Sequence, residues 1–260
     1  MRRQACAVVV VLGACGGDGI RRDAGASDAP LLADAATRDA GPDAALPGPA
    51  DAAQMVRVTG NVQFDGPVSG ATVSIIDPAV PARSTTTGAN GDFFFDVPLG
   101  ARLVFKVEGT GFRPMIRGYH ALDAGRFRTF YMLGPEEEAG ITALHALDPA
   151  KGILEVDFRN AQIGGYGVTL AAEGGGAVTP GFGVALDGDG KPVLSTTTVV
   201  GGDGSTLLLG DVPVGKVDFT PLVPGAATKT CRPCDGPPLP IQAGVVTWFD
   251  FECGDASCEG

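Results

Sequence analysis

The chain has 260 residues and a formal net charge of −11, with 40 glycines and 20 prolines. No run of basic residues occurs, which argues against a nucleic-acid partner because phosphate binding needs clustered lysine and arginine. Abundant glycine and proline are unusual for a helical protein and typical of many short strands joined by turns. We expect the acidity to keep the protein soluble rather than to recruit a particular ligand.

The first fifteen residues have the layout of an export signal. Arg2 and Arg3 precede a short apolar stretch over residues 5–12, and small residues then lead to Cys15. The stretch is about half the roughly 20 residues that a membrane-spanning helix needs, which disfavours such a helix. A cleaved signal in which Cys15 has no special role is the alternative.

The four residues that end at Cys15, Leu-Gly-Ala-Cys, resemble the lipobox of bacterial lipoproteins. In that family the signal, here residues 1–14, is removed and the cysteine carries lipid. The resemblance therefore implies lipidation of Cys15 and attachment to a membrane through that lipid. Gly16 stands where aspartate would be the best-known cue for inner-membrane retention, so we expect the outer membrane of a bacterial cell envelope.

The segment after Cys15 is low in complexity, with repeated Asp-Ala-Gly, Asp-Ala-Pro and Asp-Ala-Ala and no aromatic residue. Its four prolines oppose an alanine-rich helix, which is the alternative interpretation. Such a segment cannot bury enough apolar surface to offset the entropy of ordering it. We predict a disordered linker over residues 15–54, with a root-mean-square span on the order of 35 Å.

Residues 55–134 alternate between apolar and polar side chains with the period of two that strands show. Phe93, Phe95 and Val97 are expected to face one side, and Phe94 the other. The runs are separated by turn signals at Asp65-Gly66-Pro67, Asn90-Gly91 and Pro98-Leu99-Gly100. We expect Asn90-Gly91 to form a hairpin turn. About six or seven strands at spacings of about 8–12 residues predict a β-sandwich.

Short motifs in this region occur in a fixed order. They are Val58-Thr59-Gly60-Asn61-Val62, residues 67–73, residues 87–93, Val97-Pro98-Leu99-Gly100 and Gly109-Thr110-Gly111-Phe112. Together they resemble the carboxypeptidase regulatory-like family, whose fold is a transthyretin-like seven-stranded β-sandwich. That family carries no catalytic residues, so the resemblance implies a non-enzymatic accessory domain of the kind found on bacterial surfaces. An unrelated immunoglobulin-like sandwich is the alternative.

The alternating strand pattern breaks at Gly134-Pro135 and at the three glutamates that follow, and a second strand-rich region comes after this break. Alternation resumes over residues 154–158, where Glu155 and Asp157 are expected to point outward. One motif then recurs in order: Ser84-Thr85-Thr86-Thr87 and Asp96-Val97-Pro98-Leu99-Gly100 return as Ser195-Thr196-Thr197-Thr198 and Asp211-Val212-Pro213-Val214-Gly215. We therefore predict a second, diverged β-sandwich over residues 135–253 and a tail over 254–260. Low complexity that mimics a repeat is the alternative.

Two cysteine doublets lie near the end of the chain, Cys231 with Cys234 and Cys253 with Cys258. Their spacing is similar to that of a zinc ribbon. Export, however, takes thiols into an oxidising space where disulfides form. We predict two disulfides and neither a metal site, a redox site nor a cofactor. Bonds between the doublets are favoured over two local loops, because they pin the tail to the segment ahead of strand 244–252.

No catalytic constellation is apparent. His120 and His145 are the two histidines, and no Gly-x-Ser-x-Gly elbow accompanies them. Asp187-Gly188-Asp189-Gly190 is similar to the start of a calcium loop, but Thr198 stands where the bidentate glutamate belongs, so a hairpin turn is favoured.

Other side chains also have ordinary interpretations. The carboxylate pairs Asp92 with Asp96 and Glu155 with Asp157 share strand faces, as exposed carboxylates often do. Four aromatic residues are expected to pack in the core rather than to form a sugar-binding platform: Phe112, Tyr119, Tyr131 and Trp248.

The sequence thus predicts an all-β protein with two β-sandwich domains of transthyretin or immunoglobulin-like type after a disordered linker. We expect a lipid-anchored cell-envelope protein that acts as a non-catalytic structural or binding module. A carbohydrate- or peptide-binding accessory protein and an unrecognised hydrolase are the alternatives. Exposed aromatics on one sheet face favour glycan binding, a deep polar pocket at a histidine favours an enzyme, and long unpaired edge strands favour a protein partner.

Overall fold

The structure is a computed structural model. It describes residues 54–120, 127–161, 163–186, 192–199, 205–225, 227, 229–234 and 238–254. The expected export signal, Cys15, the linker, the Asp187–Gly190 turn and Cys258 lie outside the described residues. Within the described part of the chain, no helix combines the length and the apolar character needed to cross a membrane.

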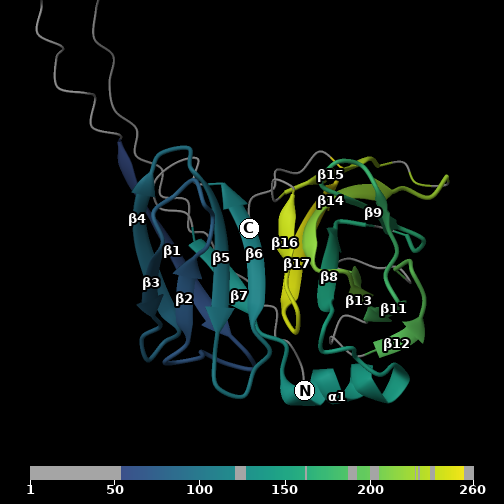
Figure 1. Cartoon of the computed structure of the whole chain (residues 1–260), viewed down its shortest axis with the longest axis horizontal. Helices are drawn as coiled ribbons and strands as arrows, with labels where there is room; N and C mark the ends of the chain where they lie inside the picture. The colour runs from purple at the N-terminus through teal and green to yellow at the C-terminus, as the bar shows by residue number, and fades with distance from the viewer. Residues whose placement is uncertain are drawn as a thin grey trace, which may run out of the picture. The chain divides into compact units, whose positions relative to one another are not determined.

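The first region, as predicted, consists of strands. They are β1 (Met55–Gln63), β2 (Thr72–Ile75), β3 (Arg83–Thr86), β4 (Asp92–Pro98), β5 (Arg102–Glu108), β6 (Met115–His120) and β7 (Phe127–Tyr131). One sheet has the order β4-β1-β7, in which β1 is antiparallel to β4 and parallel to β7. The strands β3-β2-β5-β6 form part of a second, longer sheet (Figure 1).

The second region opens with the helix α1 (Pro135–Leu144). Its strands are β8 (Gly152–Arg159), β9 (Gly167–Ala172), β10 (Ala177–Val178), β11 (Phe182–Leu186), β12 (Pro192–Ser195), β13 (Ser205–Val212), β14 (Gly215–Leu222), β15 (Cys231–Pro233), β16 (Leu239–Ile241) and β17 (Val246–Cys253). The order β10-β9-β14-β16 forms one sheet, and β12-β11-β13-β8-β17 continues the long sheet. The predicted all-β sandwich fold is confirmed.

The second region repeats the strand pairings of the first. Antiparallel β1–β4 and parallel β1–β7 correspond to antiparallel β8–β13 and parallel β8–β17. The ladder β3-β2-β5-β6 corresponds to β10-β9-β14-β16, while β11, β12 and β15 are additions. The Asp96–Gly100 and Asp211–Gly215 motifs both connect corresponding strands, β4 to β5 and β13 to β14. The serine–threonine motifs do not correspond, because β3 pairs with β2 whereas β12 pairs with β11.

Parallel pairing between β6 and β17 joins the two regions into one sheet. Met115 pairs with Val246, Ile116 with Thr247 and Arg117 with Trp248, and the two strands lie side by side in Figure 1. Because side chains alternate between the faces of a sheet, Met115 and Ile116 point to opposite sides. Met115 belongs to the core under sheet β4-β1-β7, and Ile116 to the core under sheet β10-β9-β14-β16. These two cores therefore lie on opposite faces of the long sheet.

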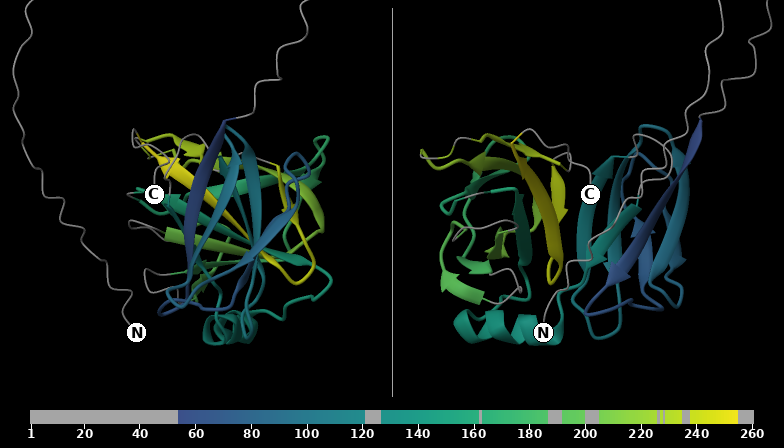
Figure 2. Two further views of the ribbon diagram at one scale, coloured as in Figure 1. Left: turned by 90° about the vertical axis from the view of Figure 1, so that its left-hand side faces the viewer. Right: turned by 180° about the vertical axis from the view of Figure 1, so that it is seen from behind.

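A third, smaller core lies where α1 meets the second region. Ile141 of α1 packs with Ile153, Leu208 and Val246, and α1 lies at one end of these strands in every view (Figure 2). Pro135 at the first helical position and three glutamates in the first turn favour a helix start here. The break in the strand pattern at this point therefore marks the N-terminus of a helix, whereas only strands were expected in this region.

The Asn90-Gly91 turn differs from the expected hairpin. Gly91 has φ +77°, and a Cβ there would lie 2.5 Å from the Val62 carbonyl oxygen. The turn joins β3 to β4, but these strands belong to different sheets. The hairpin prediction is therefore wrong, because turn chemistry sets the local backbone but does not choose the strand partner.

Phenylalanines fill the first core. Phe105 is fully buried and contacts Phe93, Phe95 and Phe130 with ring centroids 5.7–6.1 Å apart. Phe94 is 54% exposed and lies beneath the Arg57 guanidinium, 4.6 Å from its centre. The expected orientation of these strand residues is confirmed.

We expect Phe105→Ala to lower the free energy of unfolding by about 3–5 kcal/mol, because it opens a cavity among three aromatic rings. Phe94→Ala on β4 is the matched control, with an expected loss below about 1 kcal/mol. Urea unfolding followed by circular dichroism measures both. Equal losses for the two variants would contradict the assignment of Phe105 to the core.

Candidate functional site

Of the two histidines considered as catalytic residues, only His145 has a described side chain. His145 ends α1 and stacks on Phe182, with ring centroids 4.4 Å apart and planes 11° from parallel. His120 lies in β6, and its side chain is not among those described. Within the described ranges, no group of three or more histidine, cysteine or acidic side chains is placed to hold a metal ion.

Three of the four aromatic residues considered for sugar binding have described side chains. Trp248 is 5% exposed and belongs to the first core, and Phe112 packs edge-on against Phe64 at 5.2 Å. Tyr131 is 44% exposed and lies 6.0 Å from the Trp248 ring. Trp248 and Phe112 therefore serve packing, as predicted, whereas the core-packing prediction is wrong for the exposed Tyr131, and the Tyr119 side chain is not among those described.

The carboxylates of Asp92 and Asp96 make separate surface contacts. Asp96 accepts two hydrogen bonds from Arg57, at 2.9 and 3.1 Å, and this hydrogen bonding lowers the pKa of Asp96. Asp92 accepts a hydrogen bond from the Asn61 side-chain amide at 2.9 Å. Because each carboxylate has its own partner, the contacts do not favour a catalytic acid–base pair made of Asp92 and Asp96.

Asp157 does not lie on an open surface. It points away from the second core, as expected, but this part of the face meets the first region through Trp248. Trp248 Nε1 donates a hydrogen bond to Asp157 Oδ2 at 3.1 Å, and Thr206 donates one to Oδ1 at 2.5 Å. The expectation of an exposed carboxylate was therefore wrong, because β17 extends the sheet and brings Trp248 over β8.

Asp250 of β17 lies next to Asp157 of β8, since the two residues pair in register. Asp250 is fully buried and binds two guanidinium groups through Oδ2, those of Arg117 and Arg159. Its second oxygen, Oδ1, is buried and has no hydrogen-bond partner among the described residues. Two acidic and two basic side chains thus form a compact group that we term the junction cluster: Arg117, Asp157, Arg159 and Asp250.

Arg117 connects the cluster to the first region in two further ways. Its guanidinium centre lies 4.1 Å from the Trp248 ring centroid, and Nη1 donates to the Thr129 carbonyl of β7 at 2.9 Å. A guanidinium over an indole is a favourable cation–π contact, and burial strengthens it. Arg117 therefore holds β6, β7 and β17 together from one buried position.

The junction cluster shifts the protonation of Asp157. Burial, and then repulsion from Asp250, raise the pKa of Asp157 to about 6, against the opposing effects of the Thr206 hydrogen bond and the two arginines. A carboxyl that titrates near neutrality is a feature of some active sites. The cluster, however, lines neither of two described cavities, one of about 550 Å³ beside α1 and one of about 500 Å³ along residues 75–82. The contacts favour a structural role for this cluster.

Neither Arg117 nor Asp250 was expected from the sequence to be a site residue. A signal was present in both cases, because each charged residue directly follows two apolar ones, Met115-Ile116 before Arg117 and Trp248-Phe249 before Asp250. A charge inside a strand that is otherwise largely apolar indicates a buried residue with a partner elsewhere. The sequence does not identify that partner.

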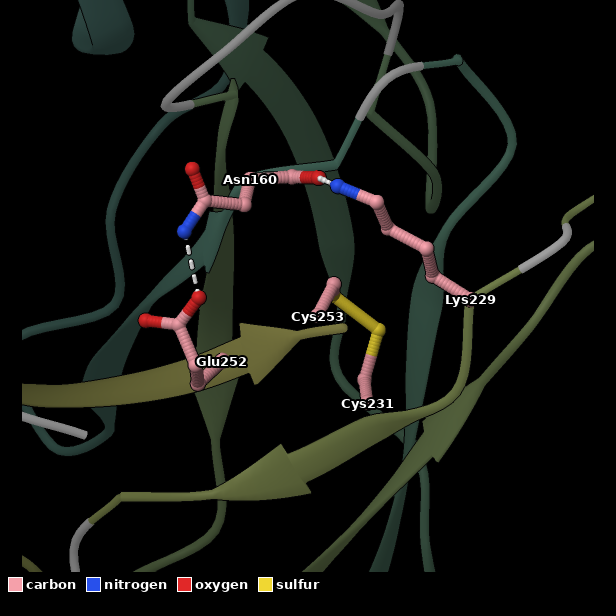
Figure 3. The surroundings of a disulfide bond; sticks show 5 residues. All are labelled: Asn160, Lys229, Cys231, Glu252 and Cys253. Carbon is pink, nitrogen blue, oxygen red and sulfur yellow. Dashed lines mark hydrogen bonds between the residues drawn. A yellow bond between two sulfur atoms is a disulfide. The ribbon is translucent and has the colours of Figure 1, made fainter. Parts of the chain in front are cut away.

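A disulfide closes the end of β17 beyond the cluster. Cys231 of β15 is bonded to Cys253 of β17, and Cys234 is also disulfide-bonded. Figure 3 shows Asn160 beside this bond, with its amide directed to the buried Glu252 and its carbonyl oxygen 3.3 Å from the Lys229 amine. The predicted disulfide chemistry is confirmed for Cys231 and Cys253, and this bond joins the two doublets as favoured.

Arg117→Met should lower the free energy of unfolding by about 3 kcal/mol, because it removes one partner of a fully buried carboxylate. The matched control is Arg159→Met, which removes the more exposed partner of the same Asp250 oxygen and should cost about 1 kcal/mol. Adding Asp250→Asn to Arg117→Met should recover part of the loss. Losses below about 1 kcal/mol for both single variants in urea unfolding would contradict a cluster that supports the junction.

Replacing Cys231 and Cys253 together by serine should lower the free energy of unfolding by about 3 kcal/mol. The estimate follows from the 22-residue separation of the two cysteines, which the bond closes into a loop. Chemical denaturation under non-reducing conditions measures the change. A loss below about 0.5 kcal/mol would show that the unfolded chain gains little freedom without the bond.

No family model matches the sequence, and no curated protein matches it either. The chain is distantly similar to several solved structures. The TIE protein of Bacillus anthracis has 11% identity over 76% of this chain and 34% of its own, with a TM-score of 0.27. The minor pilin GBS52 of Streptococcus agalactiae has 9% identity, covering 77% and 96%, with a TM-score of 0.26. The major pilin subunit BcpA of Bacillus cereus has 10% identity, covering 78% and 100%, with a TM-score of 0.29.

Proposed function

We propose that this chain is a lipid-anchored protein of the bacterial cell envelope whose two β-sandwiches act together as a non-catalytic structural or binding module. The observation that carries the proposal is the pairing of β6 with β17, which makes one continuous sheet of both regions. In a module of this kind, backbone hydrogen bonds rather than a flexible hinge connect the two sandwiches and carry force between them.

The charged residues of the junction support a structural role. Arg117 and Arg159 both bind Asp250, while Asp157 is held by Trp248 and Thr206. Side chains held by one another in a packed interior are poorly placed to bind a substrate. The first sandwich retains its proposed relation to the carboxypeptidase regulatory-like family, for which the absence of catalytic residues is typical.

The N-terminal residues and the disulfide support export. The Leu-Gly-Ala-Cys motif ends at Cys15, and the acidic linker that follows gives the proposed lipid a spacer before β1. The bond between Cys231 and Cys253 fits an oxidising compartment, because thiols remain reduced in the cytosol of most organisms. Gly16 after the cysteine makes the outer membrane our proposed destination.

The anchor is tested by expressing the full chain and its Cys15→Ala variant in a bacterium with two membranes. A clickable palmitate analogue should label the unaltered protein, which should fractionate with the envelope membranes. Cys15→Ala should lose the label and leave the membrane fraction. Cys6→Ala, within the same export signal, is the matched control and should behave like the unaltered chain. Labelled, membrane-bound Cys15→Ala protein would exclude lipidation at this residue.

A further inference from the structure

The junction cluster contains two carboxylates on adjacent strands. Asp157 of β8 and Asp250 of β17 pair in register in a parallel ladder. Paired residues in such a ladder point to the same face, and neighbouring strands lie about 4.8 Å apart. The two carboxyl groups therefore lie side by side on one face of the sheet, Asp250 fully buried and Asp157 half-buried, where like charges repel more strongly than in water.

The surroundings of this pair come from five strands. Charged side chains are supplied by Arg117 on β6, Glu155 and Arg159 on β8, and Glu252 on β17. Neutral groups are supplied by the Thr206 hydroxyl on β13, the Trp248 indole on β17 and the Thr129 carbonyl on β7. Glu252 binds the Asn160 amide and faces Arg232 across the β15–β17 ladder, so it lies at the outer end of the cluster.

The two carboxylate oxygens of Asp250 differ in their contacts, because both guanidinium groups bind Oδ2. Its Oδ1 is enclosed and accepts no hydrogen bond from the described residues. A buried acceptor without a donor is costly. A protonated Asp157 can supply the missing donor and still accept from Trp248 and Thr206, since a carboxylic acid keeps acceptor capacity.

We propose that the closed junction holds one proton shared between Asp157 and Asp250, and that loss of this proton loosens the pairing of β17 with β6. Asp157 then carries a second negative charge beside Asp250, directly beneath the Trp248 indole that enters the first core. Opening the junction lets water reach Asp157 and relieves this repulsion. The proton links the contact between the sandwiches to external pH, and this link does not depend on the lipid anchor.

The direction of the pH dependence follows from the raised pKa of Asp157. Burial first, and Asp250 second, raise its pKa from 3.8 to about 6 in the closed junction. In an open, hydrated junction the pKa returns toward its ordinary value, so the closed form binds the proton more tightly. Lower pH therefore favours the closed form, and raising the pH through about 6 favours opening. A pKa difference of about two corresponds to about a 100-fold change in the opening equilibrium between pH 4 and pH 8.

Trp248 is the one tryptophan of the chain, so its fluorescence reports this site alone. In the full-length protein, acrylamide quenching and emission wavelength should change with a midpoint near pH 6, and quenching should increase on the alkaline side. Asp157→Asn should abolish the transition. Asp96→Asn, which removes an exposed carboxylate on β4, is the control and should retain it.

Thr206→Val provides an independent test should Asp157→Asn fail to fold. The Thr206 hydrogen bond favours the charged form of Asp157, so its removal should move the midpoint above that of the unaltered protein. A merely structural loss at Thr206 would lower stability without displacing the midpoint. The proposal is overturned if quenching is the same at pH 5 and pH 8, if Asp157→Asn folds and keeps the transition, or if Thr206→Val leaves the midpoint unchanged.

Discussion

Parallel pairing of β6 with β17 brings together Arg117 and Asp250, which are 133 residues apart in the sequence. Closing so long a loop costs entropy that local contacts cannot offset. Burial on both faces of the joined strands provides the compensation, with Met115 and Trp248 in one core and Ile116 and Phe249 in the other. The two cores thus share a single sheet, so neither is complete without a strand contributed by the other region.

Buried charge at this junction has a consequence beyond stability. A slip of one residue between β6 and β17 would turn Arg117 to the opposite face and leave Asp250 buried with only the guanidinium of Arg159. Such a register is strongly disfavoured, since a buried charge that loses a partner costs several kcal/mol. Hydrophobic residues alone would tolerate the slip better, because both faces of these strands are apolar. We therefore infer that the junction cluster selects the register between β6 and β17. The proposed proton on the cluster adds a dependence of this pairing on pH.

The sequence predicts those strands that have one face toward a core. Alternation identified the buried positions of β4 and β8 because Phe94 and Glu155 lie on the other side. It failed at β6, where Met115 and Ile116 are both buried and no alternation remains. The role of Arg117 was missed for the same reason. The expectation of export, by contrast, predicted the disulfide, because the redox chemistry of a compartment does not depend on contacts between distant residues.

The shared sheet implies that both sandwiches fold as one unit through the β6–β17 contact. Scanning calorimetry of residues 54–260, with the disulfides intact, tests this most directly. One transition whose calorimetric and van't Hoff enthalpies agree is the predicted result. Two separate transitions, each with the enthalpy of a region of about 100 residues, would show instead that the sandwiches unfold independently and that the shared sheet contributes little.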